Sequence, residues 1–220
     1  NIGNIRFKVF VESNEVINAT KTTVILQSHY QSVSNFNDLK VACADGGIDI
    51  IRITEDILFT DNIQVEHSIK IVGNKNNFNL SGHSICLNEG IQFNTEKILF
   101  NNGDTAIIQK NNSKLDLTDC TFTNCTSSEY NQLGSCIFCD TDISNIDNPL
   151  DFETNLTNCT FIDNQNCIFH SGQLTVNNCK LHNIDTDYLN TNNVAFVYQT
   201  DGYANIRNSI FDIDYSTTSL

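Results

Sequence analysis

An internal repeat constrains the fold of this 220-residue chain more than any other sequence feature. One copy runs from Leu156 to Gly172 and is anchored on Cys159, with further repeat positions five before, three before and two after the anchor. The successive copies read Leu115, Leu117, Cys120, Phe122; Thr154, Leu156, Cys159, Phe161; Leu174, Val176, Cys179, Leu181; and Ala204, Ile206, Ser209, Phe211, with an upstream copy at Phe93, Thr95, Ile98, Phe100. Repeats of this kind are typical of solenoids, whose neighbouring copies stack to bury a shared core.

The spacing within each copy predicts three short strands per coil. The positions before the anchor alternate with polar residues, which is the period of a strand with one buried face. Asp or Asn directly precedes the anchor in four copies and suits a corner, because both residues tolerate left-handed backbone. A third apolar run follows each anchor: Ala106-Ile107-Ile108, Cys136-Ile137-Phe138, Cys167-Ile168-Phe169 and Ala195-Phe196-Val197. The pattern therefore predicts an all-β parallel β-helix with three-strand rungs.

In this fold the anchors Cys120, Cys159, Cys179 and Ser209 form one inward column, and Phe122, Phe161, Leu181 and Phe211 form the next. The third runs place Cys136 and Cys167 in another column, beside Ala106 and Ala195. We interpret these cysteines as buried thiols that behave as small apolar residues. Neighbouring rungs lie about 4.8 Å apart, so oxidation of adjacent thiols is a strained alternative. We predict reduced cysteines, with no disulfide that folding requires.

We expect one elongated domain over residues 1–220, as a fragment of a longer protein. Residues 1–35 are predicted to form cap strands, and residues 48–214 the rungs. Residues 37–45 have an N-cap candidate, helix-compatible residues and a stop at Gly46-Gly47, which predicts a short capping helix. Such a helix is needed because an uncovered solenoid end exposes strand edges and core.

Charge excludes several classes of partner. Twelve basic residues against 26 acidic ones give a net charge of −14, and Arg6, Arg52 and Arg207 are the only arginines. Nucleic-acid binding needs clustered basic residues that neutralise phosphates, and this chain has no such cluster. No stretch approaches the roughly 20 apolar residues of a membrane-spanning helix. We expect neither a nucleic-acid partner nor a membrane span in this chain.

Several motifs resemble known β-helix families. The candidate helix, Gly46-Gly47, Asp49-Ile-Ile-Arg-Ile-Thr54 and the run Ser68 to Asn74 resemble the start of pectate-lyase-like right-handed β-helices. Later rungs resemble adhesin-like surface proteins of methanogenic archaea and the repeats of chlamydial polymorphic outer-membrane proteins. Phe161-Ile-Asp-Asn164 matches the chlamydial Phe-x-x-Asn signature. The resemblance covers about Asn37 to Asp214 and implies a right-handed coil, an extracellular or cell-surface location and a role in adhesion.

The resemblance also allows an enzyme, so we compared the sequence with the active sites of this fold. Pectate lyases use an arginine base, and the three arginines lie in no matching motif. The hydrolase set of Asn-x-Asp, Asp-Asp, Gly-His-Gly and Arg-x-Lys does not assemble, since no Asp-Asp pair exists and the only Arg-x-Lys begins at Arg6. Two suitably spaced carboxylates would still suffice for glycoside hydrolysis. The candidate pairs are Asp116 with Glu153 and Asp104 with Asp140, and the candidate aromatic platforms are Tyr130, Tyr188 and Tyr198.

Metal and cofactor sites are weakly indicated. Asp140, Asp142 and Asp147 lie in or beside an inserted loop and are candidate oxygen ligands for calcium, although a solvated acidic loop explains them as well. The five histidines show no paired ligand spacing and are expected at surfaces or corners. We expect no cofactor. The sequence favours a non-catalytic adhesin-like module that binds host or microbial surface glycans or proteins. The alternative is a carbohydrate-active enzyme, a polysaccharide lyase or glycoside hydrolase with a divergent site.

Overall fold

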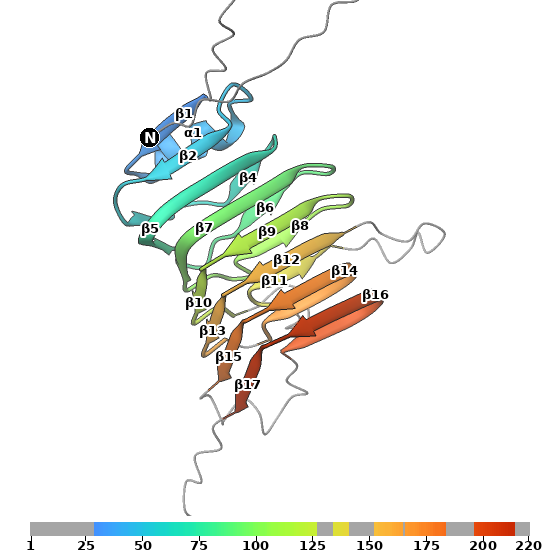
Figure 1. Cartoon of the computed structure of the whole chain (residues 1–220). Helices are drawn as coiled ribbons and strands as arrows, with labels where there is room; N and C mark the ends of the chain where they lie inside the picture. The colour runs from blue at the N-terminus through green and yellow to red at the C-terminus, as the bar shows by residue number, and fades with distance from the viewer. Residues whose placement is uncertain (1–28, 127–133, 141–151, 165, 184–195, 214–220) are drawn as a thin grey trace, which may run out of the picture.

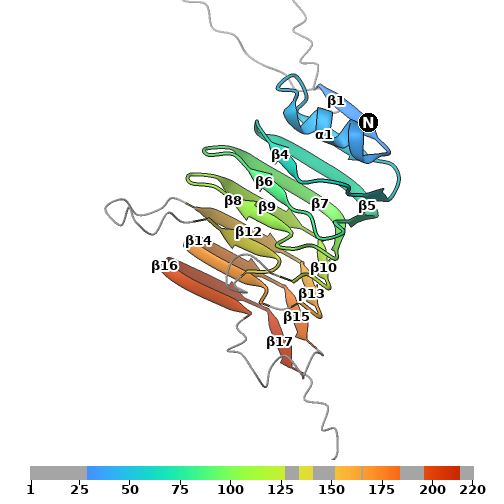
Figure 2. The same ribbon diagram turned by 180° about the vertical axis from the view of Figure 1, so that it is seen from behind.

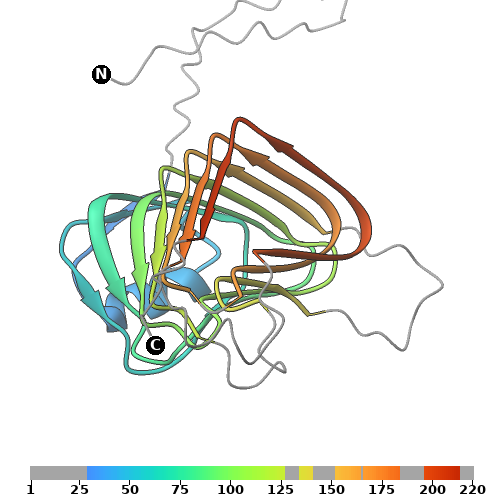
Figure 3. The same ribbon diagram turned by 90° about the horizontal axis from the view of Figure 1, so that it is seen from below.

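The structure is a computed structural model that describes residues 29–126, 134–140, 152–164, 166–183 and 196–213. Within these ranges, seventeen strands join in one sheet, and every strand pairing between coils is parallel. The strands stack coil upon coil along one direction (Figure 1). Seen from below, the coils lie over one another around a common interior (Figure 3). The predicted parallel β-helix is confirmed.

Each full coil contributes a first, a second and a third strand, which stack into three sheets. The first-strand sheet contains β1 (Tyr30–Val33), β2 (Ile50–Ile53), the first halves of β5 (Ile69–Asn79) and β7 (Gln92–Asn101), β9 (Lys114–Thr118), β12 (Glu153–Thr157), and the second halves of β14 (Ile168–Asn177) and β16 (Val197–Arg207). The second-strand sheet contains β3 (Ile57–Leu58), the rest of β5 and β7, β10 (Thr121–Thr123), β13 (Thr160–Ile162), β15 (Lys180–Asn183) and β17 (Ile210–Ile213). The third-strand sheet contains β4 (Ile63–Val65), β6 (Ile85–Leu87), β8 (Ile107–Gln109), β11 (Ile137–Cys139) and the first halves of β14 and β16.

The corner between the first and second strands depends on Asp and Asn. Asp119, Asn158, Asn178 and Asn208 have φ angles of 54°, 55°, 54° and 52°, the left-handed conformation that the repeat predicted. Their side chains also stack, because Asn158 Nδ2 donates to Asp119 Oδ1 at 3.1 Å and Asn178 Nδ2 donates to Asn158 Oδ1 at 2.7 Å. The same residues thus turn the chain and connect successive coils.

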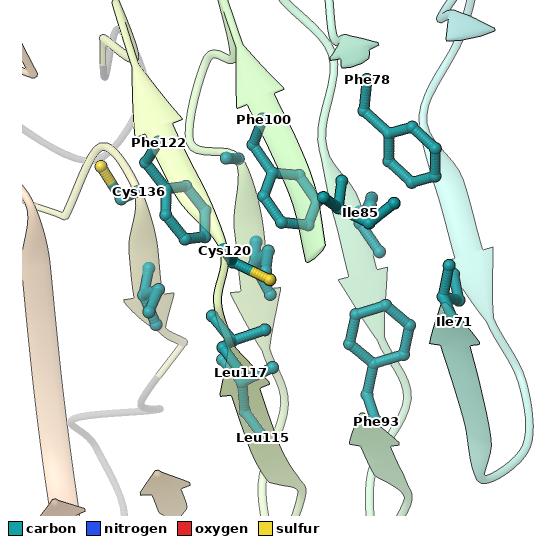
Figure 4. Close-up of a cluster of buried hydrophobic side chains, with 14 of the residues drawn as sticks. Ile71, Phe78, Ile85, Phe93, Phe100, Leu115, Leu117, Cys120, Phe122 and Cys136 are labelled. Carbon is teal, nitrogen blue, oxygen red and sulfur yellow. The ribbon is translucent and has the colours of Figure 1, made fainter. Parts of the chain in front are cut away.

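A ladder of aromatic rings forms the centre of the core. It runs through Phe36, Phe59, Phe78, Phe100, Phe122 and Phe161, with ring centroids 4.7–5.8 Å apart. Figure 4 shows part of this ladder, with the rings of Phe78, Phe100 and Phe122 on successive coils. The predicted register is confirmed, since Phe122 pairs with Phe161, Phe161 with Leu181 and Leu181 with Phe211.

The anchor column is also inward, and its thiols serve as hydrogen-bond donors. Cys120, Cys159 and Cys179 are buried. Each thiol contacts a backbone carbonyl two residues earlier and another in the preceding coil; for Cys159 these are Thr157 O and Leu117 O, both at 3.5 Å. A small side chain with a donor therefore suits this corner. All nine cysteines are free thiols in the structure, and their redox state in solution stays a prediction.

One expected pairing is wrong by a single residue. Val197 pairs with Ile168, so Phe196 and not Ala195 stands beside Cys167. The backbone confirms this shift, because Ile168 N donates to Phe196 O at 3.0 Å. The repeat fixes strand positions less firmly here because a long insertion precedes this strand.

Helix α1 (Phe36–Ala44) closes the N-terminal end, as expected, although it begins one residue earlier than the sequence suggested. Asn35 is its N-cap, and its side-chain oxygen accepts from Asp38 N at 3.0 Å. In the part of the chain that the structure describes, no helix is long and apolar enough to cross a membrane. β1 pairs with β2 as a first strand, whereas the cap strands expected before residue 29 lie outside the described residues. The domain limits stay a prediction.

The C-terminal coil of the described residues lies at the opposite end from α1 (Figure 2). Among the described residues, β16 and β17 pair only with β14 and β15 of the coil before. Phe211 is 44 % exposed, whereas its column neighbour Leu181 is 0 % exposed. Ser209, the last member of the anchor column, is likewise only half-buried. The two columns keep their predicted register, but the expected burial of these last members is wrong.

Candidate binding face

The outward side of the first-strand sheet presents polar side chains in columns. Strand alternation turns every second side chain outward, and the parallel register places equivalent residues above one another, about 4.8 Å apart. We call these side chains the first-strand face. Its columns are Gln92, Lys114, Glu153, Gln173, Tyr203; Tyr30, Ile50, Lys70, Asn94, Asp116, Asn155, Thr175, Asn205; and Ser32, Arg52, Val72, Glu96, Thr118, Thr157, Asn177, Arg207.

A hydrogen-bonded network joins three neighbouring strands of this face. Asp116 accepts from Gln92 Nε2 at 3.1 Å and from Asn155 Nδ2 at 2.8 Å. Asn155 Nδ2 also donates to Glu153 Oε1 at 3.2 Å, and Lys114 Nζ lies 2.7 Å from Glu153 Oε2. Side chains held in this way lose little conformational freedom when a ligand binds, so the face is preorganised.

A shallow depression lies at one end of the face, beside this network. It has a volume of about 140 Å³ and is lined by Asp49, Ser68, Ile69, Lys70, Gln92 and Asn94. Two contacts fix its walls: Gln92 N donates to Ser68 Oγ at 2.9 Å, and Lys70 Nζ lies 2.5 Å from Glu96 Oε1. The lining offers a carboxylate, a hydroxyl, an ammonium and two amides, whereas Ile69 beneath them is buried.

Of the two carboxylate pairs expected from the sequence, the structure brings one together. Asp116 and Glu153 accept from the same nitrogen, Asn155 Nδ2. Hydrogen bonds from Lys114 and Asn155 lower the pKa of Glu153 below its usual range, so it is ionised at neutral pH. A glycosidase acid needs the opposite, a raised pKa that keeps its proton. This pair is therefore suited to accepting hydrogen bonds, and Glu153 is not suited to donating a proton.

The second pair is not brought together. Asp104 forms a bridge with Thr126 before β8, whereas Asp140 follows β11 and pairs with Lys110. Because β8 and β11 run parallel, the two carboxylates lie at opposite ends of neighbouring strands. They do not form a catalytic pair.

Of the three metal-ligand candidates, only Asp140 lies within the described residues. Asp140 is engaged by the Lys110 ammonium, and Asp142 and Asp147 lie outside the described residues. Across the described ranges, no group of three or more His, Cys, Asp or Glu side chains is placed to hold a metal ion. Binding of calcium by the inserted loop stays a prediction.

Of the three aromatic candidates only Tyr198 is described, and it does not lie on the first-strand face. Tyr130 and Tyr188 fall outside the described residues, and Tyr198 lies on the third-strand sheet, stacked on Phe169 at 5.5 Å. Sequence reasoning missed Tyr203, which is exposed and shares the Gln92 column. It also missed Gln92 and Asn94. The signal was present, because all three occupy outward positions of the first strand once the repeat is phased.

A second cluster of polar groups lies inside the coil, away from the face. His170 Nε2 lies 3.0 Å from Thr154 Oγ1, which donates to Gln109 Oε1 at 2.6 Å. His170 is fully buried, so its expected position at a surface or corner is wrong, and burial lowers its pKa to about 4. Cys139 lies in the same column as His170, one coil earlier. Burial raises the pKa of the Cys139 thiol to about 12. Both groups are neutral at pH 7, which excludes a thiolate–imidazolium nucleophile here.

The stacked coils, the inward columns and the outward polar face define this chain as a parallel β-helix protein. It belongs to the family of pectate lyase-like adhesive domains, whose family model matches residues 30–169. No curated protein and no solved structure gives a match. The match includes the depression and the Asp116 network, and it supports an adhesin-like role. The archaeal and chlamydial resemblance stays a prediction.

Proposed function

We propose that this domain is a non-catalytic adhesion module at the cell surface, and that it binds glycans through the first-strand face. The observation that carries the proposal is the network of Gln92, Asp116, Asn155 and Glu153, which spans three coils. It provides fixed amide and carboxylate groups at a regular spacing. Family membership supports the adhesive role in general, and the network supports the choice of surface.

The chemistry of the face favours a neutral glycan. Sugar hydroxyls both donate and accept hydrogen bonds, which matches a surface of carboxylate acceptors and amide groups. Lys70 in the lining forms an ion pair with Glu96, and Lys114 on the next strand but one forms an ion pair with Glu153. With a net charge of −14, the protein would repel a polyanion such as a polyuronide. A protein ligand is the competing partner, and the experiment below separates the two.

The test is binding to a glycan array, followed by calorimetry on the best neutral oligosaccharide. We expect Gln92→Ala and Asn94→Ala each to weaken binding about tenfold, which corresponds to about 1.4 kcal/mol per lost set of hydrogen bonds. Gln64→Ala is the matched control, because Gln64 is an exposed glutamine on β4 of the third-strand sheet. The first-strand face is not the binding surface if Gln64→Ala weakens binding equally. The same conclusion follows if neither Gln92→Ala nor Asn94→Ala changes binding to the array. Binding to surface proteins with no glycan bound would reject the ligand class.

One observation favours the alternative function of a carbohydrate-active enzyme. Asp116 and Glu153 share one amide donor, so two carboxylates do meet on the face. We expect no turnover in reducing-sugar and unsaturated-product assays over a polysaccharide panel, with and without calcium. Product release that disappears in Asp116→Asn, while binding to the same polysaccharide remains, would replace adhesion with catalysis at this site.

A further inference from the structure

Three polar side chains meet inside the coil, where neighbouring coils carry apolar ones. Thr154 occupies an inward first-strand position that is Leu115 in the coil before and Leu174 in the coil after. Gln109 and His170 lie in one inward column of the third-strand sheet, two coils apart. All three polar residues are 0 % exposed. Burying a polar group costs free energy, so a cluster of them in an apolar core calls for an explanation.

The three side chains have the chemistry of a nucleophile, an electrophile and a base. Thr154 Oγ1 lies 2.6 Å from Gln109 Oε1, which places the hydroxyl beside the carboxamide carbon that bears this oxygen. His170 Nε2 lies 3.0 Å from the same hydroxyl, close enough to take its proton. The hydroxyl proton turns to Gln109 Oε1 when the imidazole proton is on Nε2, and to Nε2 when the imidazole proton is on Nδ1. In the second arrangement the hydroxyl oxygen is activated for attack.

Two neighbours stabilise the charges that such an attack creates. Cys139 Sγ lies 3.6 Å from Gln109 Oε1 and donates to it, so the S–H group meets the negative charge that develops on this oxygen. Burial lowers the pKa of His170 and keeps the ring neutral, as a base must be. The amide of Gln199, in the next coil, offsets part of this lowering of the pKa and so favours the imidazolium formed by proton transfer. The core also excludes water, which would compete with the Thr154 hydroxyl.

We propose that this site forms an internal ester cross-link between the side chains of Thr154 and Gln109, in a single turnover that the chain performs on itself. The hydroxyl gives its proton to His170 Nε2 while Thr154 Oγ1 bonds to Gln109 Cδ. The Cδ–Nε2 bond of Gln109 then breaks, and its electron pair leaves with the nitrogen, which takes the proton from His170 and departs as ammonia. One C–O bond replaces one C–N bond, and the reaction needs neither an oxidant nor a reductant.

The cross-link ties β8 to β12 in the interior of the coil. Gln109 and Thr154 are 45 residues apart in the sequence, so the bond closes a long loop. Closing such a loop lowers the conformational entropy of the unfolded chain and therefore opposes unfolding. This suits a domain that is pulled during adhesion. The reaction itself is independent of the first-strand face and of any glycan bound there.

The experiment is mass spectrometry of the intact full chain under denaturing conditions, followed by peptide mapping. We expect a mass lower than that of the sequence by one ammonia, and two peptides joined through Gln109 and Thr154 that hydroxylamine separates. Thr154→Ser keeps a hydroxyl and should keep the cross-link, whereas Thr154→Val should have the full mass of its sequence. Circular dichroism establishes whether each variant is folded. The peptide map of the unmodified chain decides the proposal even if Thr154→Val does not fold.

Thr95→Val is the matched control, because Thr95 is a second buried threonine of the first-strand sheet whose hydroxyl has no hydrogen-bond partner among the described residues. It should still lose one ammonia. His170→Gln removes the base and should slow formation of the cross-link about a hundredfold, which repeated mass measurements at neutral pH follow. An unmodified chain that keeps its full mass overturns the proposal, and so does an ammonia loss confined to a single peptide. Equally fast formation in His170→Gln would show that His170 is not the base.

Discussion

The same inward columns run to both ends of the coil, but the two ends differ in whether another element covers the outermost side chain. At the N-terminal end, Phe36 of α1 lies 5.2 Å from Phe59 and thus begins the aromatic ladder on a helix. At the other end the last described member of the column is Phe211, which contacts the ring of Phe196 in its own coil at 5.8 Å and stays 44 % exposed. Because each coil contacts only its neighbours, a repeat position is buried only where a further coil or a cap follows. Burial at the ends is therefore a property of what lies next to the coil.

The largest expected effect comes from comparing one column in the middle and at the end. Phe161→Ala should cost about 3 to 5 kcal/mol of unfolding free energy, because the ring is fully buried between Phe122 and Leu181. Phe211→Ala should cost about 1 kcal/mol, because its ring is 44 % exposed and so little apolar surface is lost from the core. Urea unfolding followed by circular dichroism gives both values. Equal costs for the two variants would show that Phe211 is packed as tightly as Phe161.

The next largest effect is a loss of folding stability at acidic pH, which we attribute to His170 on β14. His170 on β14 is neutral when folded, and its pKa is lowered to about 4 by burial, partly offset by the amide of Gln199 on β16. The unfolded chain takes up the proton near its usual pKa of about 6.5. Stability present at pH 7 should therefore fall as the pH drops from about 6.5 to 4, by about 3 kcal/mol in total. Urea midpoints at intervals of pH measure this slope.

The control for that prediction is His170→Gln, which cannot titrate. Glutamine has no ionisable group, so the stability of this variant should lack the steep fall between pH 6.5 and 4 even if its absolute stability is lower. Parallel pH profiles for the two proteins would contradict the assignment to His170.

A smaller effect is expected in the cysteine column. Cys159→Ala should cost about 1 to 3 kcal/mol, because it removes a packed sulfur and its contacts with two carbonyls. Ser209→Ala, at the same column position in the last described coil, should cost less because Ser209 is only half-buried. Thermal melting of both variants makes the comparison. Reductant should leave the melting temperature of the unmodified protein unchanged; a large drop would show a disulfide between neighbouring coils.

The smallest effect tests the cap itself. Asn35→Ala removes the acceptor for Asp38 N and should destabilise the protein by about 1 kcal/mol. Asn37→Ala is the control, since Asn37 is an exposed residue within α1 and is not its N-cap. If both variants melt alike, the cap contributes nothing beyond helix propensity. Loss of the whole N-terminal end with Asn35→Ala would mean that closure depends on this residue far more than its hydrogen bond suggests.

Much of the candidate face could have been derived from the repeat. Once Leu115 and Leu117 are set inward, Lys114 and Asp116 must point outward, and the register then stacks Glu153 and Asn155 on the same columns. The depression could not be derived, because it brings Asp49 and Ser68 beside Gln92 from coils that precede the clear repeat. The same limit explains Asp104 and Asp140, whose separation depends on which ends of two parallel strands they occupy.

The sequence by itself determined the parallel β-helix, its inward columns and its Asp and Asn corners, because strand period and left-handed backbone are local properties of these residues. Only the tertiary structure decided which groups are isolated from water. It placed His170 in the interior, engaged Glu153 with Lys114, and left Phe211 exposed while equivalent residues are buried. Burial and pKa depend on neighbours from other coils. Those neighbours are set by stacking, which no single copy of the repeat contains.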